Sequence, residues 1–210
     1  MSPKAKQAHR RLAVLIGVFL MVHFATHFAA IAGIAAQDQM LQWGRAIYRI
    51  PVIEIALVLA LAAQVIIGLK LLGQIKRRKR KGFWHRAQFL SACYLAYFIV
   101  MHTVAALTAR LGVLTGSGLD TNFFWAAGTL VLDPLRYGFA PYYLLAVIAL
   151  VTHLIAALHF RGARRWHAFA LAIGPLAGAL IVAAYGGAFY AIEMPDAHRE
   201  YFAVFPGVEL

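Results

Sequence analysis

Residues 51–75 read PVIEIALVLALAAQVIIGLKLLGQI, and the basic run KRRKRK follows at once at 76–81. An α-helix needs about 20 mostly apolar residues to cross the hydrocarbon core of a bilayer, so the first segment is long enough to span it. Lys and Arg gather on the cytoplasmic side of spanning helices, so the second segment indicates which end lies inside. Together the two segments predict a transmembrane helix with a defined direction.

The rest of the chain repeats this pattern. Hydrophobic residues make up 62% of the sequence and charged residues only 13%, which excludes an ordinary soluble domain. The first apolar stretch is too long for the core of a signal peptide and is interpreted as a retained span. We therefore predict an all-α bundle of five transmembrane helices, forming a single transmembrane domain over residues 1–210, with spans at about 12–36, 51–75, 87–111, 138–160 and 167–192.

The positive charges lie on one side of this arrangement. If the N-terminus is inside, the inner segments carry clusters of Lys and Arg at 4–11, 76–86 and 161–165. The outer segments carry only Arg45, Arg49, Arg110, Arg136 and Arg199. This asymmetry predicts a multi-pass protein of the bacterial inner membrane with a cytoplasmic N-terminus and a periplasmic C-terminus. The net charge of +12 then reflects membrane topology and not binding to nucleic acid.

Two connections on the outer side are long, at about 37–50 and 112–137. The second contains the turn residues Gly116-Ser117-Gly118 and Asp133-Pro134. It also contains Phe123, Phe124 and Trp125, which predict an aromatic belt or a short helix lying on the membrane. A lid over a binding site is the alternative interpretation of these aromatic residues.

The informative polar residues inside the spans are His23, His102 and His153, on three different helices. Ionisable groups within a membrane are costly and are usually functional. One buried histidine is readily satisfied by a polar neighbour, but three on three helices favour a cofactor. Haem needs only one or two imidazoles and an apolar cleft, whereas zinc and di-iron sites favour nearby carboxylates. We therefore predict that these histidines are ligands of haem iron.

The depths of the histidines divide them into two levels. His23 lies 12 residues beyond Arg11 and His102 lies 16 beyond Arg86, which places both about 18–24 Å from the inner boundary. His153 lies eight residues before Arg161, about 12 Å from that boundary. His23 and His102 can therefore share one haem b toward the outer side, and His153 belongs to a second level.

Three segments carry a family resemblance: LIGVFLMVH at 15–23, QDQMLQW at 37–43 and YLLAVIALVTH at 143–153. In their order and spacing the chain resembles the five-helix cytochrome b membrane anchor of the succinate dehydrogenase/fumarate reductase superfamily. The resemblance implies two stacked b haems, each held by two axial histidines. Its outer pair corresponds to His23 and His102, and its inner pair should come from spans 2 and 4.

The inner level departs from the pattern that the resemblance implies. Span 4 supplies His153, but Gln64 stands at the position in span 2. The resemblance then leaves an inner haem that is absent, five-coordinate through His153, or held by another ligand. Val151 stands where proton-moving members have a carboxylate, and the acid of the family's quinol site falls near Arg45 to Arg49.

Two sets of cations have alternative interpretations. Arg45 and Arg110, with Arg49, are candidate partners of haem propionates, or they extend toward the interface as ordinary flanking residues. The run from Lys76 to Lys81 is a candidate docking site for cytoplasmic iron–sulfur and flavoprotein subunits. It is also suited to contact anionic lipid.

The preferred function is a b-type haem protein that carries electrons between the membrane quinone pool and a redox partner, as the cytochrome b subunit of an oxidoreductase. A stand-alone haem enzyme is one alternative, with an open coordination position that acts on a hydrophobic substrate. A haem-free transporter or structural protein is the other. The sequence leaves open whether quinone binds and whether copies of the chain associate.

Overall fold

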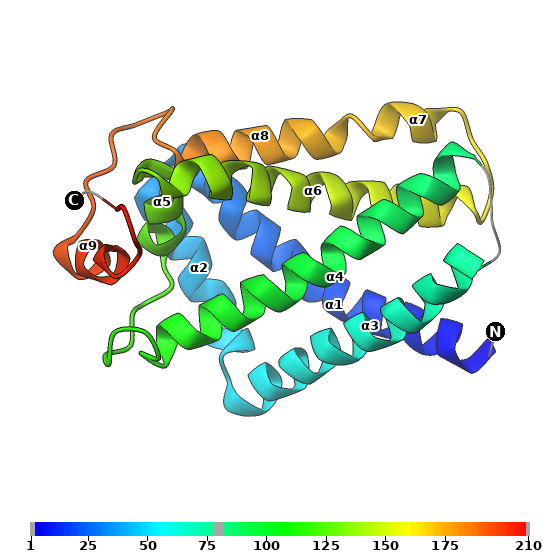
Figure 1. Ribbon diagram of the computed structural model, residues 1–210, viewed down its shortest axis with the longest axis horizontal. Helices are drawn as coiled ribbons and strands as arrows, with labels where there is room; N and C mark the ends of the chain where they lie inside the picture. The colour runs from blue at the N-terminus through cyan, green and yellow to red at the C-terminus, as the bar shows by residue number, and fades with distance from the viewer. Residues whose placement is uncertain (1–2, 78–81, 209–210) are drawn as a thin grey trace.

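The computed structural model describes residues 3–77 and 82–208, and the regular structure in these residues is entirely helical (Figure 1). The elements in chain order are α1 Pro3–Ala29, the short 3-10 helix η1 Ala30–Ala32, α2 Ile34–Tyr48, α3 Pro51–Arg77, α4 Phe83–Arg110, α5 Phe123–Val131, α6 Leu135–His159, α7 Trp166–Ala170, α8 Ile173–Tyr185 and α9 Asp196–Ala203.

Five helical segments are long and apolar enough to cross a membrane, which confirms the predicted number of spans. They run over Pro3–Ala32, Pro51–Gln74, Phe83–Arg110, Leu135–His159 and Trp166–Tyr185. Their apolar side chains face outward: Val52 is 72% exposed and Phe169 is 79% exposed. Exposure of so much apolar surface to water would be unfavourable. These faces therefore indicate a multi-pass membrane protein in contact with lipid.

The first span differs from its predicted bounds of 12–36 at both ends. Its helix begins already at Pro3, and the chain turns at Gly33, whose φ of +125° favours glycine. The following segment, expected as a connection over 37–50, is the helix α2, which folds back and packs against α1. The chain between the first two spans is therefore largely ordered as helix.

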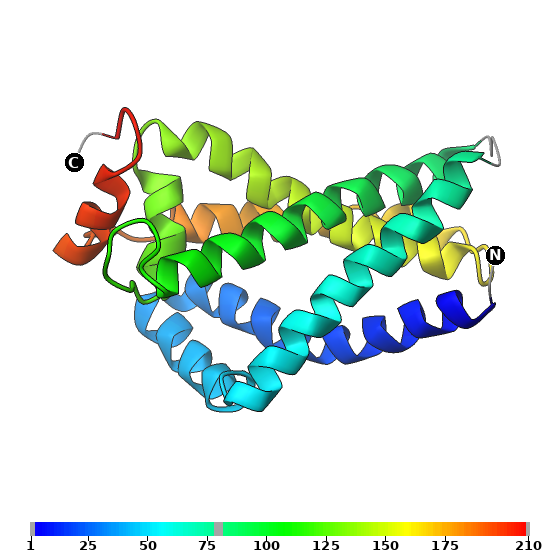
Figure 2. The ribbon, with the colours of Figure 1, turned by 60° about the horizontal axis from the view of Figure 1, so that its bottom comes forward.

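The two ends of the bundle differ in the segments that they contain. The start of α1, the end of α3, the start of α4 and the α6–α7 connection lie at one end, which we call the basic end (Figures 1 and 2). The α1–α2 turn, α5, α9 and the C-terminal segment lie at the opposite end (Figures 1 and 2). The described residues of the Lys and Arg clusters that were predicted to share one side of the membrane thus lie at the same end of the protein.

The fifth span is shorter than predicted. It consists of α7 and α8, which are separated by Leu171 and Ala172, and it ends at Tyr185 instead of near 192. Gly186 and Gly187 follow, and Gly187 has a φ of +80°. This left-handed residue stops the helix, because a side chain there would be strained.

The aromatic residues of the 112–137 connection do form a short helix, but it does not lie on the surface. The side chain of Asn122 caps α5 by accepting a hydrogen bond of 3.0 Å from the backbone of Phe124. Phe123 is only 1% exposed and stacks on Tyr185 at 4.8 Å between ring centroids. The helix α5 is packed against α6, α8 and α9, so the predicted interfacial belt is wrong for this segment.

The contact between α5 and α9 predicts which glycine of this region resists substitution. A Cβ at Gly128 would overlap the ring of the fully buried Phe202, whereas a Cβ at Gly138 has open space around it. We expect Gly128→Ala to lower the free energy of unfolding by about 1–3 kcal/mol through overpacking. Gly138→Ala should leave it unchanged or raise it by up to about 1 kcal/mol through helix propensity.

Thermal unfolding in detergent, followed by circular dichroism, measures both variants against the wild type. Equal transition temperatures for the two variants would contradict the packing of α9 on α5.

Candidate functional site

Three histidine side chains meet between α1 and α4. His23 and His27 are one helical turn apart on α1 and so lie on one face of the helix. Their Nε2 atoms are 3.1 Å apart, and the ring centroids of His23 and His102 are 6.1 Å apart. The adjacency of His23 and His102 is the one expected from their depths, whereas the sequence did not indicate that His27 joins them.

Aromatic side chains surround this cluster. Phe19 stacks on His23 and Phe98 stacks on His102, with ring centroids 5.4 and 5.1 Å apart. The hydroxyl of Tyr185, at the end of α8, lies 2.9 Å from Nδ1 of His27. The cluster thus joins α1, α4 and α8 through side chains that fix the orientation of the imidazoles.

The hydrogen bond between two imidazoles requires complementary tautomers. One Nε2 must carry the proton and the other must accept it, because two protonated or two bare nitrogens would repel each other. If Nε2 of His27 is the acceptor, its Nδ1 is protonated and donates to the hydroxyl oxygen of Tyr185. If Nε2 of His27 is the donor, Tyr185 donates to Nδ1 instead. In either case the cluster is satisfied with all rings neutral.

The spacing of two of these imidazoles can be compared with the spacing that a haem would require. In residues 3–77 and 82–208 no group of three or more His, Cys, Asp or Glu is arranged to hold a metal. Two imidazoles bound at about 2 Å on opposite sides of one iron place their ring centroids roughly 6 Å apart. The centroids of His23 and His102 are close to this separation, and their planes are 68° apart. The side chain of His27 lies beside the first of them, so a macrocycle requires it to turn away.

His102 also lines a cavity of about 170 Å³ toward the end of the bundle that lies opposite the basic end. Its walls come from α4, α5, α6 and α9, and they are almost entirely aromatic or aliphatic. The polar atoms within reach are few, and among them the Thr129 hydroxyl donates to the Tyr143 hydroxyl at 3.4 Å. The lining residues include Trp125, Phe139 and Tyr142. Such a space fits a flat apolar group in contact with His102.

A second polar level lies nearer the basic end. Nδ1 of His153 is 3.4 Å from the hydroxyl of Ser91, and Nε2 of Gln64 is 3.4 Å from Nε2 of His9. His9 and His153 are close enough to interact electrostatically. The structure therefore brings a histidine from span 1 to the side of Gln64, which the sequence analysis did not consider. The sequence does contain an indication of this position of His9. His9 lies 14 residues before His23, which is nearly four helical turns and places both on the same face of the helix.

This second level contains unsatisfied polar atoms. Nδ1 of His9 and Oε1 of Gln64 are buried and have no hydrogen-bond partner among residues 3–77 and 82–208. A buried polar group without a partner costs about 1–3 kcal/mol, so native structures usually supply one. The orphaned atoms mark a place where a bound group would find polar contacts.

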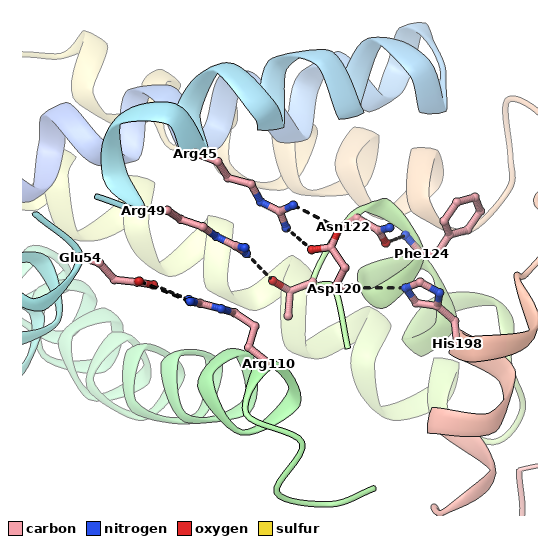
Figure 3. Close-up of polar contacts among 9 residues, drawn as sticks. Arg45, Arg49, Glu54, Arg110, Asp120, Asn122, Phe124 and His198 are labelled. Carbon is pink, nitrogen blue, oxygen red and sulfur yellow. Dashed lines mark hydrogen bonds and ion pairs between the residues drawn. The ribbon is translucent and has the colours of Figure 1, made fainter. Parts of the chain in front are cut away.

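The arginines at the opposite end form a connected set with two acids (Figure 3). Arg45 is buried and pairs with Asp120, with 2.8 Å between Nη2 and Oδ1. Arg110 forms a bidentate pair with Glu54, joining the ends of α4 and α3. Two of the three arginines predicted as propionate partners are thus matched by carboxylates of the chain.

Arg49 is the cation of this set that has no carboxylate of its own. Its Nη2 donates to the hydroxyl of Thr121 at 3.1 Å (Figure 3). Burial, together with the positive charges of Arg45 and Arg110, lowers the pKa of Arg49 from its ordinary value. Three arginines against two acids leave this cluster with one excess positive charge, which suits an anionic group nearby.

His198 on α9 completes the contacts of Asp120. Its Nε2 donates to the backbone carbonyl of Asp120 at 3.3 Å (Figure 3). Burial lowers the pKa of His198 below 6.5, although the carbonyl and the charge of Asp120 act in the other direction. The neutral form is therefore favoured, and it fastens α9 to the connection between α4 and α5.

The basic run from Lys76 to Lys81 was predicted as a docking site for soluble subunits. Residues 78–81 of this run lie outside the described residues, so the structure does not bear on that prediction.

The burial of Arg45 predicts unequal effects for two similar substitutions. Asp120→Asn leaves a buried guanidinium without its counter-charge, and we expect it to lower the free energy of unfolding by about 1.5–3 kcal/mol. Asp133→Asn removes the partner of Arg136 in a pair that is about half exposed at both ends. Its cost should stay below about 1 kcal/mol.

Thermal unfolding of the two variants in the same detergent compares these costs directly. A larger loss for Asp133→Asn than for Asp120→Asn would show that the Arg45 pair does not hold this end together.

Comparison of the chain with known protein families, with curated proteins and with solved structures finds no match. The functional interpretation therefore rests on the residues and their geometry.

Proposed function

We propose that this chain is a b-type haem protein of the bacterial inner membrane that carries electrons between the quinone pool and a redox partner. The observation that carries the proposal is the pair His23 and His102, whose rings meet edge to face in mid-span with centroids 6.1 Å apart. The surrounding rings of Phe19 and Phe98 exclude water and orient the imidazoles. A resemblance to the cytochrome b anchors of the succinate dehydrogenase/fumarate reductase superfamily agrees with this assignment.

Each residue of the cluster has a separate task in this proposal. His23 and His102 hold the haem from opposite sides, and the bound haem supplies reversible one-electron transfer. Two axial imidazoles leave no open position, which suits electron transfer better than chemistry on a substrate. His27 stays hydrogen-bonded to Tyr185 when its ring turns from His23. The excess charge of Arg49 is available to a propionate.

The cavity beside His102 is the proposed place for a quinone ring. Its walls are apolar and aromatic, and the hydroxyl of Tyr143 offers a hydrogen bond to a carbonyl oxygen, because Thr129 already donates its proton within the protein. Contact with His102 would put such a ring close to the haem edge. Electrons could then pass between the two groups without a protein intermediate.

The second level is proposed as a weaker or altered haem site held by His153. Gln64 is a poor ligand for iron, but His9 lies beside it and presents a buried nitrogen without a partner. His9 thus replaces Gln64 as the candidate second ligand at this level. A haem held by His153 alone would have an open coordination position, which is the case for the alternative of a haem enzyme.

The first test is the haem itself and its ligands. Purified wild-type protein should show the Soret and alpha bands of a low-spin b haem, and His23→Ala or His102→Ala should abolish them, because either change removes an axial ligand. His27→Ala is the matched control on the same helix face and should keep the bands. A wild-type protein without haem, or ligand variants with wild-type spectra, would refute the proposal.

Carbon monoxide separates the two levels in the same preparations. Reduced protein should resist carbon monoxide at the level of His23 and His102, because both axial positions are filled. A fraction that does bind it should disappear in His153→Ala if that haem is five-coordinate. Unchanged haem content and carbon monoxide binding in His153→Ala would make His153 a packing residue only.

The second test is the orientation, which we propose as N-terminus inside because the Lys and Arg clusters share the basic end. A reporter active only in the cytoplasm should give signal when fused after residue 80 and none when fused after residue 205. Signal at both sites would be incompatible with five spans, and signal only after residue 205 would reverse the orientation.

A further inference from the structure

The basic end has a hollow on its surface that plays no part in the proposed electron transfer. It lies where α4 begins and where α6 passes into α7, and its volume is about 320 Å³, enough for a small ligand. Two arginines, an indole and an imidazole form most of its lining. The lining residues are Trp84, His159, Ala163, Arg164, Arg165 and Ala168.

Aromatic stacking and hydrogen bonds connect the residues that line this hollow. The indole of Trp84 lies against the ring of His159, with centroids 4.2 Å apart and planes 16° from parallel. The buried His167 accepts a hydrogen bond of 3.3 Å at Nδ1 from the backbone N–H of Arg164. Its Nδ1 also lies 3.5 Å from Nδ1 of His159. These contacts tie α4, α6 and α7 together and hold the start of α7 in place beside the hollow.

The charge at this end is uncompensated by the chain. The sequence has no Asp or Glu from residue 1 to 37, from 55 to 119, or from 134 to 192. Those ranges include all three basic clusters. Arg164 and Arg165 are exposed, and in the described part of the chain neither forms an ion pair. The hollow thus presents two guanidinium groups that lack an anion.

We propose that this hollow binds the phosphate headgroup of an anionic phospholipid. Guanidinium groups bind phosphate oxygens in paired hydrogen bonds, and Arg164 and Arg165 supply two of them at one rim. Ala163 and Ala168 leave room for the glycerol part. Phe160 and Phe169, both exposed beside the hollow, offer apolar surface to the acyl chains.

The position of the hollow selects a lipid over a free anion. It lies where two spanning segments, Leu135–His159 and Trp166–Tyr185, reach the end of their apolar length, which is the depth of the headgroups. Indole rings such as that of Trp84 favour this depth. Basic pockets between transmembrane helices on the cytoplasmic side bind such headgroups. The site does not depend on haem.

Lipid titration of the purified full-length protein tests the proposal. Delipidated protein in a neutral detergent is titrated with phosphatidylglycerol or with phosphatidylcholine of the same acyl chains, and native mass spectrometry counts the bound lipids. The wild type should show one site that prefers phosphatidylglycerol. Arg164→Gln with Arg165→Gln should weaken that site roughly fivefold for each arginine removed.

The matched control is Arg10→Gln with Arg11→Gln, which removes the same charge from exposed positions at the same end but away from the hollow. It should change the affinity by less than about twofold, because screening limits distant charges. Equal losses in both double variants would reduce the effect to general surface attraction and overturn the proposal.

Inorganic phosphate distinguishes a simple anion site from a lipid site. Displacement of phosphatidylglycerol by inorganic phosphate at a similar concentration would overturn the lipid assignment. Thermal unfolding of both double variants verifies that they remain folded. The haem spectrum should be unchanged in both, so a failure here is separate from a failure of the proposed function.

Discussion

Hydrocarbon offers no hydrogen-bond partner, so polar side chains carried into these spans must be matched by other groups of the protein. The hydroxyl of Thr26 finds its partner within its own helix, where it donates to the carbonyl of Val22 one turn earlier. Tyr94 reaches across to another helix and donates to the carbonyl of Tyr142 at 2.8 Å. An imidazole needs two hydrogen-bond partners, because each ring has two nitrogens. This need gathers His23 and His27 into one cluster with Tyr185 and holds α1 against α8.

The same constraint separates the two polar levels of the bundle. At the level of His23, both nitrogens of His27 have partners within the protein. At the level of His153, the polar atoms of His9 and Gln64 are only partly satisfied. Because unsatisfied buried groups cost free energy, the second level gains more from any molecule that supplies hydrogen bonds or accepts a ligand. Gln64 therefore keeps this level polar.

Helical periodicity and apolar length made much of this arrangement predictable from the sequence. The five spans and the adjacency of His23 and His102 follow from counting residues at about 1.5 Å each. The helix α2 was missed, because a stretch containing Gln37, Asp38 and Arg45 resembles a polar connection until its packing against α1 is known. His9 received no role because it lies outside the predicted span of 12–36, although its helix begins at Pro3.

Burial, unlike periodicity, depends on which elements meet. Phe123 and Trp125 have the composition of an interfacial belt, and nothing in their local sequence indicates that α8 and α9 cover them. The pairing of Arg45 with Asp120 joins residues 75 positions apart, so no local pattern reveals it. Long-range contacts of this kind decide whether an arginine is available to a ligand. Here Arg45 and Arg110 are paired with acids of the chain.

The two ends of the bundle consequently handle charge in opposite ways. At the end away from the basic end, Asp120, Glu54 and Asp133 each neutralise an arginine. The connections there are therefore held to the bundle by ion pairs within the chain. At the basic end the sequence supplies cations and no acids, so neutralisation has to come from outside. An anionic membrane surface provides it within a Debye length. A soluble redox partner that docked there would need its own negative surface and would have to displace lipid headgroups from the same cations.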